Sequence, residues 1–199
     1  MVRYLDKGEI DPRARATCEL RAGVLERWDG HRGFGPLNAR RAMERACVLA
    51  KENGVGLVAL GNNNHWLRGG TYGWLAADRG FIGICWSNTM PNMPAWGGKT
   101  AGSETTRSFG VASLNGEHVV WTAQYPVFLR KIEDCGCGAC SCPCRAVTMQ
   151  RGTDARPAEI ETGRVLPMGY WKGSGLSIVL DLIATVLGRQ FGAEDRNIR

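Results

Sequence analysis

Long apolar segments are scarce in this sequence of 199 residues, and none approaches the roughly 18–20 residues that a membrane-spanning helix requires. Residues 1–7 also lack the apolar stretch that defines a secretory signal peptide. We therefore expect a cytoplasmic protein that has no membrane partner.

A concentrated basic segment is absent as well. The 25 Lys and Arg residues exceed the 19 Asp and Glu residues, which gives a net charge of +6, but the basic side chains are scattered along the chain. Segments that bind nucleic acid gather Lys and Arg in blocks of about 5–8 residues, so we expect no nucleic-acid partner. An apolar share of 44% and a charged share of 22% exclude a disordered or fibrous protein.

Two nucleotide-binding motifs, the Walker A loop and the Rossmann GxGxxG fingerprint, do not occur. Helical and strand patterns alternate instead. Apolar residues recur at spacings of three and four after Pro36 until Asn53 and Gly54 stop the pattern, which predicts an amphipathic helix. Strands are predicted over residues 24–30, 55–60 and 81–86, and further helices over residues 72–79 and 175–187. This order predicts an α/β fold in which helices flank a mixed sheet.

The segment after the second predicted strand, residues 62–70, is the first candidate site. His65 follows three asparagines and precedes Arg68, and side chains at strand ends often line the active sites of α/β proteins. A histidine there can exchange a proton near neutral pH, while the amides and the guanidinium can orient a hydroxylated or carboxylated substrate. The alternative is a turn and capping segment, and the sequence leaves both interpretations open.

A second candidate site precedes the last helix, at residues 168–175. Its glycines expose backbone amides at a helix start, and Lys172 adds a positive charge, which together suit a phosphate or a carboxylate. The alternative is a glycine-rich entry into a core helix. The other two histidines, His31 and His118, lie in polar turns, and we predict both as surface residues.

Five of the eight cysteines fall between Cys135 and Cys144. Thiolates bind zinc well, but two CxxC units separated by a loop are absent, and no histidine lies nearby. A reducing cytoplasm also disfavours disulfides. We therefore predict no metal site, and a non-catalytic zinc-binding or interaction module built on this cluster stays as the alternative.

Three segments in order carry a resemblance to a known family: residues 64–74 (NHWLRGGTYGW), residues 83–88 (GICWSN) and residues 166–175 (LPMGYWKGSG). They resemble the malate/L-lactate dehydrogenase family, most closely its 2,3-diketo-L-gulonate reductases. The resemblance is almost continuous over residues 1–99 and 160–187.

The resemblance implies an oxidoreductase with a non-Rossmann α/β fold that works as a homodimer. Such enzymes pass hydride between the nicotinamide of NAD or NADP and a small 2-oxo or 2-hydroxy acid, while a histidine handles the proton of the substrate oxygen. His65 matches the histidine that has this role in some members. Trp171 and Lys172 match a pair that contacts the cofactor.

The chain also departs from the family pattern. Members carry an upstream Ser-His-Gly segment, whose histidine is the proton donor in diketogulonate reductases, and a C-terminal segment that completes the cofactor site. Both lie beyond the ends of this chain, so we expect an incomplete fold and little activity. We predict three parts: a family-like region at residues 1–99, a disturbed region at residues 100–160, and a cofactor loop with the last helix at residues 161–199.

A slipped reading frame is our hypothesis for the disturbed region. Residues 139–149 can be encoded so that the frame starting at the third base reads LQLPVPGGYD, which resembles the family. The same shift turns residues 102–109 into IGNNPFV and residues 120–128 into VDSAISRF. Because cysteine codons are TGC or TGT, this shift always yields Leu, Val or Met codons, so ordinary core residues can become a cysteine run. Sequencing the coding DNA again tests the hypothesis.

Overall fold

The computed structural model describes residues 2–88, 93–94, 101–102, 105–112, 115–123, 147–149, 152–154, 164–165 and 170–188. These residues belong to two units, and each unit is described by itself. The first consists of Met1–Trp86, Arg107–Thr122 and Ile183–Phe191. The second consists of Ser87–Thr106, Ala123–Leu182 and Gly192–Arg199.

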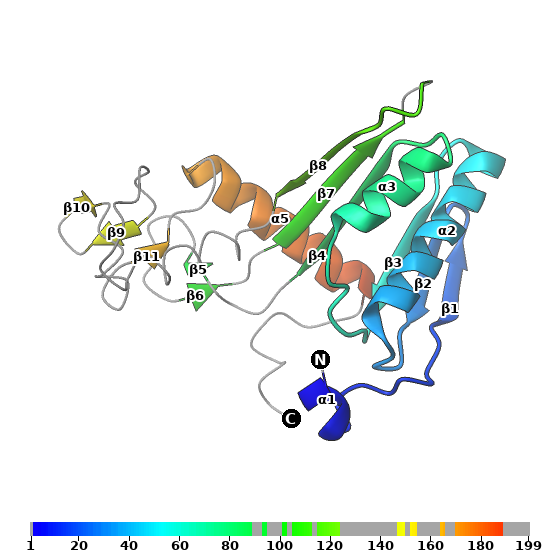
Figure 1. Cartoon of the computed structure of the whole chain (residues 1–199), viewed down its shortest axis with the longest axis horizontal. Coiled ribbons are helices and arrows are strands. Elements are labelled where there is room, and N and C mark those ends of the chain that lie inside the picture. The colour runs from blue at the N-terminus through cyan, green and yellow to red at the C-terminus, as the bar shows by residue number, and fades with distance from the viewer. Residues whose placement is uncertain are drawn as a thin grey trace. The chain divides into compact units, whose positions relative to one another are not determined.

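A three-stranded mixed sheet forms one layer of the first unit, after the short helix α1 (Val2–Asp6) (Figure 1). β1 (Thr17–Ala22) runs antiparallel to β2 (Leu25–Asp29), and β2 runs parallel to β3 (Leu57–Gly61). The strands predicted over residues 24–30 and 55–60 are thus confirmed. The sequence did not predict β1, because most of its side chains are exposed and impose no apolar alternation.

The register of the parallel pair places Asp29 beside Gly61, so β2 and β3 end at the same edge of the sheet. The segments that follow them, residues 30–34 and 62–69, therefore begin as neighbours. The backbone N–H of Gly30 donates a hydrogen bond to the Gly61 carbonyl at 2.8 Å, which extends this pairing beyond the strands.

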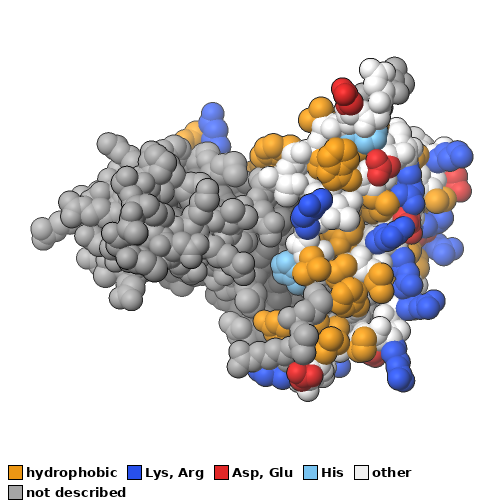
Figure 2. Space-filling model, in the orientation of Figure 1, with side chains coloured by type: hydrophobic (Ala, Val, Ile, Leu, Met, Phe, Trp, Pro, Cys, Tyr) orange, Lys and Arg blue, Asp and Glu red, His pale blue; other side chains and the backbone are white. Residues whose placement is uncertain are grey.

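Helix α2 (Gly35–Asn53) covers this sheet, and both of its ends match the prediction. Pro36 occupies its first turn, where a missing N–H costs nothing. Gly54 ends it in the left-handed conformation with φ 81°, and its N–H donates to the Ala50 carbonyl. In the face shown in Figure 2, Lys and Arg side chains are spread along the side of α2 with acidic side chains among them.

A second sheet has the strand order β4 (Gly83–Asn88), β7 (Thr105–Val111) and β8 (Val119–Ala123). Helix α3 (Gly70–Asp78) lies against it, two residues earlier at its start than the sequence predicted. A side chain on Gly110 of β7 would overlap the Gly73 carbonyl of α3, so the helix and strand backbones touch directly. Glycine at both positions permits this approach.

The core of the first unit lies between α2, α3 and β3. Its buried members are Ala39, Trp66 and Tyr72, and the side chains of Met43, Leu60 and Cys85 pack against them. The Trp66 and Tyr72 rings are stacked with their centroids 5.3 Å apart. The segment that contains His65 is therefore attached to the core through its neighbour Trp66.

Helix α5 (Tyr170–Gly188) starts five residues before the predicted start. The helix includes Gly173 and Gly175, which the sequence predicted as the glycine-rich entry to a later start. This extension corrects the expectation about apolar segments, because Trp171–Gly188 is long and apolar enough to cross a membrane by length and composition alone. Core helices of soluble proteins can have the same length and composition, so this helix alone does not show a membrane protein.

The described residues of the second unit form two small antiparallel sheets. One pairs β5 (Met93–Pro94) with β6 (Ala101–Gly102), and the other has the order β10 (Gly152–Asp154), β9 (Val147–Met149) and β11 (Arg164–Val165). Residues 100–160 thus hold several strands where the sequence showed no clear element. The cysteines between Cys135 and Cys144 lie outside the described residues. Within the described residues, no group of three or more His, Cys, Asp or Glu side chains can hold a metal ion.

Candidate active site at the end of β3

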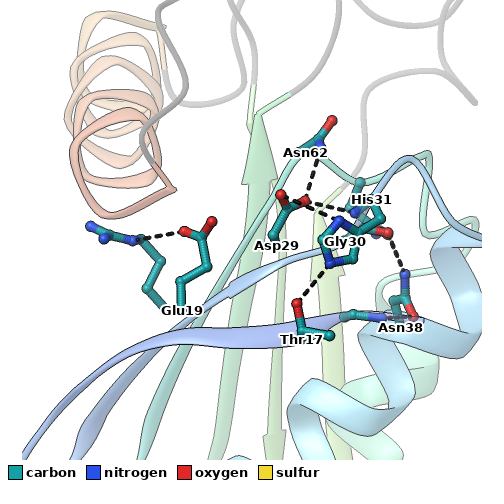
Figure 3. Close-up of polar contacts among 10 residues, drawn as sticks. Thr17, Glu19, Asp29, Gly30, His31, Asn38 and Asn62 are labelled. Carbon is teal, nitrogen blue, oxygen red and sulfur yellow. Dashed lines mark hydrogen bonds and ion pairs between the residues drawn. The ribbon is translucent and has the colours of Figure 1, made fainter. Parts of the chain in front are cut away.

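The segment from Asn62 to Gly69 leaves the end of β3, and its first side chain binds the end of β2. Asn62 has a positive φ of 44°, and its Nδ2 donates a hydrogen bond to Asp29 Oδ1 at 2.8 Å (Figure 3). The N–H of Arg32 donates to the Asn62 carbonyl at 2.8 Å. These bonds hold the two segments that follow the parallel strands together.

Asn38, a buried amide on α2, holds the second asparagine. Its Nδ2 donates to Asn63 Oδ1 at 3.0 Å and to the Gly30 carbonyl at 3.1 Å, and its Oδ1 accepts from the Ala16 N–H at 3.1 Å. Only 1% of Asn38 is exposed. The sequence pattern did not single out Asn38, although a polar residue on the apolar face of a predicted helix signals a buried polar contact.

The third asparagine also binds within the protein. Asn64 Nδ2 donates to the Arg32 carbonyl at 2.7 Å and lies 3.3 Å from the Glu9 and Gly33 carbonyl oxygens. A side chain on Gly35 would overlap the carbonyls of Asn64 and His65, so the start of α2 lies against this backbone. The three amides therefore shape the segment, and their role in orienting a substrate stays a prediction.

His65 is exposed, in contrast to the residues on both sides of it. Its Nδ1 accepts a hydrogen bond from the Leu67 N–H at 2.9 Å. The next residue, Trp66, is 9% exposed, and its carbonyl accepts a hydrogen bond from the Tyr72 hydroxyl at 2.6 Å. Burial raises the pKa of Tyr72 to about 12, so this hydroxyl keeps its proton and remains a donor. The imidazole thus stands on a segment that is fixed before and after it.

Arg68 is the second exposed functional group of the segment. Within the described part of the chain, its guanidinium has no ion-pair partner. It precedes α3, whose first turn contains no acidic residue and whose N-cap, Gly69, provides no side-chain cap. A helix N-terminus carries partial positive charge, so this position favours an anion such as a carboxylate.

The other two histidines have structural partners. His31 Nε2 lies 2.7 Å from Thr17 Oγ1, and its backbone N–H donates to Asp29 Oδ1 at 2.7 Å (Figure 3). His31 is exposed, as predicted. The prediction is wrong for His118, because only 10% of its side chain is exposed, and its Nε2 lies 3.3 Å from Asp78 Oδ1.

Trp171 and Lys172 lie in the first turn of α5, in the second unit. Both side chains are exposed, and Lys172 Nζ stands 5.5 Å from the centre of the Trp171 ring. The first turn contains no acidic residue, so the lysine charge adds to the positive end of the helix. A cation beside an exposed indole suits a ligand that combines phosphate groups with aromatic rings, as a nicotinamide dinucleotide does.

A family model for malate/L-lactate dehydrogenases matches residues 1–197. The chain belongs to the malate/L-lactate dehydrogenase family. A 2,3-diketo-L-gulonate reductase from Mannheimia succiniciproducens is 42% identical over 201 aligned residues, which cover 94% of this chain and 57% of that protein. The resemblance found in the sequence is thereby confirmed.

Solved structures of this family share the fold. Sulfolactate dehydrogenase from Methanocaldococcus jannaschii has a TM-score of 0.88 and 27% identity, with 97% of this chain and 57% of that chain covered. A dehydrogenase from Sinorhizobium meliloti has a TM-score of 0.81 and 27% identity, with coverages of 96% and 57%. The predicted mixed α/β fold of the chain is confirmed. The chain spans 57% of the length of each of these three proteins.

Proposed function

We propose that this family member acts as an oxidoreductase on a small 2-oxo or 2-hydroxy acid, of the kind that 2,3-diketo-L-gulonate represents, with NAD or NADP as cofactor. The observation that carries the proposal is the segment after β3, which presents an exposed imidazole and an exposed guanidinium on a fixed backbone. The 42% identity to a 2,3-diketo-L-gulonate reductase supports this substrate class.

Each of the two exposed groups suits one part of such a substrate. The Arg68 guanidinium can bind the carboxylate through two parallel hydrogen bonds, which also orients the neighbouring C2 carbon. The His65 imidazole then acts at the C2 oxygen, either by exchanging a proton or by donating a hydrogen bond. When bound, the nicotinamide supplies or accepts hydride at C2.

Trp171 and Lys172 are the proposed cofactor residues. The ammonium group of Lys172 can pair with a cofactor phosphate near the start of α5, and the exposed Trp171 ring can pack against an aromatic ring of the cofactor. Neither residue distinguishes NAD from NADP. On the family resemblance we extend the proposal to a cytoplasmic homodimer, in which residues 1–99 act on the substrate and residues 161–199 hold the cofactor.

Thermal unfolding of the purified chain tests the proposal without requiring turnover. We expect NADH or NADPH to raise Tm. In Lys172→Gln, about tenfold more cofactor should be needed for the same rise in Tm, which corresponds to the loss of one charge-assisted contact. Lys51→Gln, at the exposed end of α2, is the matched control and should leave the shift unchanged. A chain that responds to neither cofactor at millimolar concentration contradicts the proposal.

Turnover and metal content are measured separately. Because residues 100–160 show no regular apolar pattern in the sequence, we propose that turnover of 2,3-diketo-L-gulonate is low. Rapid oxidation of NADH with this substrate would overturn that expectation. The zinc-binding alternative concerns cysteines outside the described residues. One equivalent of tightly held zinc in the purified protein would favour that alternative.

A further inference from the structure

An imidazole at a carbonyl oxygen can have two roles, and its tautomer decides between them. A charged ring can give a proton to the oxygen, and a neutral ring with a bare Nε2 can take a proton from a hydroxyl group. A neutral ring with its proton on Nε2 can do neither directly, but it can donate a hydrogen bond to the carbonyl oxygen. The proposed function leaves this choice open for His65.

The hydrogen bond from the Leu67 N–H determines which His65 tautomer is favoured. A backbone N–H can only donate, so His65 Nδ1 must offer its lone pair at the 2.9 Å separation between these nitrogens. A proton on Nδ1 would face the Leu67 N–H, and two donors cannot form a hydrogen bond with each other. Both the charged ring and the neutral ring with its proton on Nδ1 therefore lose this bond, and the neutral ring with its proton on Nε2 keeps it.

The backbone conformation of Leu67 directs its N–H at the ring. Leu67 has a φ of 67°, in the left-handed region that residues other than glycine seldom adopt, while its side chain is 50% exposed. An exposed leucine gains little from this conformation through packing. The conformation is imposed by its neighbours, since Trp66 is buried and held by Tyr72, and Gly69 packs closely against the Trp66 ring.

We propose that Leu67 is a positioning residue whose backbone N–H selects, for the neutral His65 ring, the tautomer with its proton on Nε2, so that His65 polarises the substrate carbonyl and does not protonate it. This inference rests on the proposed function for its substrate. When the carbonyl carbon receives hydride, the electron pair of the C=O bond moves to the oxygen, and the Nε2–H hydrogen bond stabilises the resulting charge. A water molecule then supplies the proton and leaves hydroxide.

Nitrogen-15 NMR of the chain tests the tautomer directly. The chain has three histidines, so His65→Gln, His31→Gln and His118→Gln assign the ring signals by subtraction. We expect His65 to show a bare Nδ1 and a protonated Nε2 in long-range proton–nitrogen spectra at pH 7. A protonated Nδ1, or a doubly protonated ring, overturns the inference whatever the chain does with a substrate.

Two variants test the role of the backbone. Leu67→Gly keeps the N–H and accepts a positive φ without strain, so the His65 tautomer should be unchanged. Replacing the Trp66–Leu67 amide by an ester, with the α-hydroxy acid analogue of leucine at position 67, removes the N–H and leaves φ free to stay positive. We expect the His65 signals to shift to a mixture of tautomers in this ester variant, while the spectra of α2 and its sheet stay native. A wild-type tautomer in the ester variant contradicts the inference.

Side-chain replacement of His65 separates this inference from the proposed function. Glutamine can still donate an N–H, whereas alanine cannot. We expect the turnover of His65→Gln to stay within about tenfold of wild type. The turnover of His65→Ala should be at least tenfold lower than that of His65→Gln. Equal losses of turnover in the two variants would overturn the role of His65 as a hydrogen-bond donor. If neither cofactor nor 2-oxo acid affects the chain, the proposed function fails while the tautomer measurement still stands.

Discussion

Asn38 Nδ2 on α2 donates a hydrogen bond to Asn63 Oδ1, at 3.0 Å, on the segment that leads to His65. The two residues are 25 positions apart. The same Asn38 amide binds the Gly30 carbonyl and the Ala16 N–H. One buried side chain thus joins the start of α2, the ends of two parallel strands and the approach to β1.

Asn38→Ala should lower the free energy of unfolding by about 3 kcal/mol, because it leaves buried polar groups without partners. Urea unfolding followed by circular dichroism measures this change. Asn53→Ala is the matched control, since the Asn53 amide makes one hydrogen bond, to the Leu49 carbonyl at the exposed end of the same helix. Equal losses in the two variants would show that the Asn38 network does not stabilise the fold.

Local signals allowed the sequence to predict part of this region. The ends of α2 were predicted because Pro36 and Gly54 act on the backbone within one turn. The site segment was identified because it follows a strand. The roles of its asparagines were not predicted, since their partners are far away in sequence, as in the Asn64 bond to the Arg32 carbonyl across 32 positions.

The predicted exposure of His118 and the predicted start of α5 were also wrong for physical reasons. His118 lies beside a turn in the sequence, but β8 brings it to α3, where its ring is 6.0 Å from the Trp74 ring centre. Helix α5 starts at Tyr170, before Gly173 and Gly175. A glycine costs a helix only about 1 kcal/mol, which the apolar residues of a long helix can offset.

Glu26 should make the fold sensitive to acid. Its side chain is 1% exposed and accepts hydrogen bonds from Arg45 Nη2 at 2.7 Å and from Trp28 Nε1 at 2.9 Å. The Arg45 hydrogen bond is the main reason that the pKa of Glu26 is lowered, against the opposing effect of burial. A lowered pKa stabilises the folded state at pH values above the ordinary pKa of about 4.5. This stability is lost as the pH falls through the lower pKa that Glu26 has in the folded state.

Unfolding in urea between pH 7 and pH 3 measures this dependence. We expect Glu26→Gln to be less stable than wild type at pH 7 and to lose less stability on acidification. Glu19→Gln is the matched control, because Glu19 is 42% exposed and pairs with Arg27 at 3.4 Å. A Glu26→Gln chain with the acid dependence of wild type would refute the assignment.

Tyr72 should make the fold sensitive to alkali. Burial raises its pKa from about 10 to about 12, so the folded state holds a proton that the unfolded state releases first. The stability from this group is therefore complete below pH 10 and declines as the pH rises towards 12. Tyr72→Phe removes this decline, and it also removes the hydroxyl bond to the Trp66 carbonyl, at a cost of about 1 kcal/mol at pH 7.

Thermal unfolding from pH 8 to pH 11 of wild type, Tyr72→Phe and Tyr4→Phe distinguishes these effects. Tyr4 is 48% exposed, so its replacement should follow the wild-type profile. The curves of wild type and Tyr72→Phe should approach each other above pH 10. Parallel curves across this range would mean that Tyr72 titrates at its ordinary value in the folded state.

Gly35→Ala should disturb the His65 segment without touching any functional side chain. An added Cβ would overlap the carbonyl oxygens of Asn64 and His65, and neither backbone group can move as the end of a flexible side chain can. We expect a loss of about 2–3 kcal/mol, as in other overpacked sites, together with shifted NMR signals for His65 and Leu67. The matched control is Gly175→Ala in α5, because a Cβ there meets no atom of the described residues within 4 Å. Alanine should stabilise that helix by about 0.5–1 kcal/mol, so the same substitution has opposite effects on stability at the two positions.

If Gly35→Ala is neutral and leaves the His65 signals in place, then the start of α2 does not fix this segment, and the bonds of Asn38 and Asn64 must hold it alone.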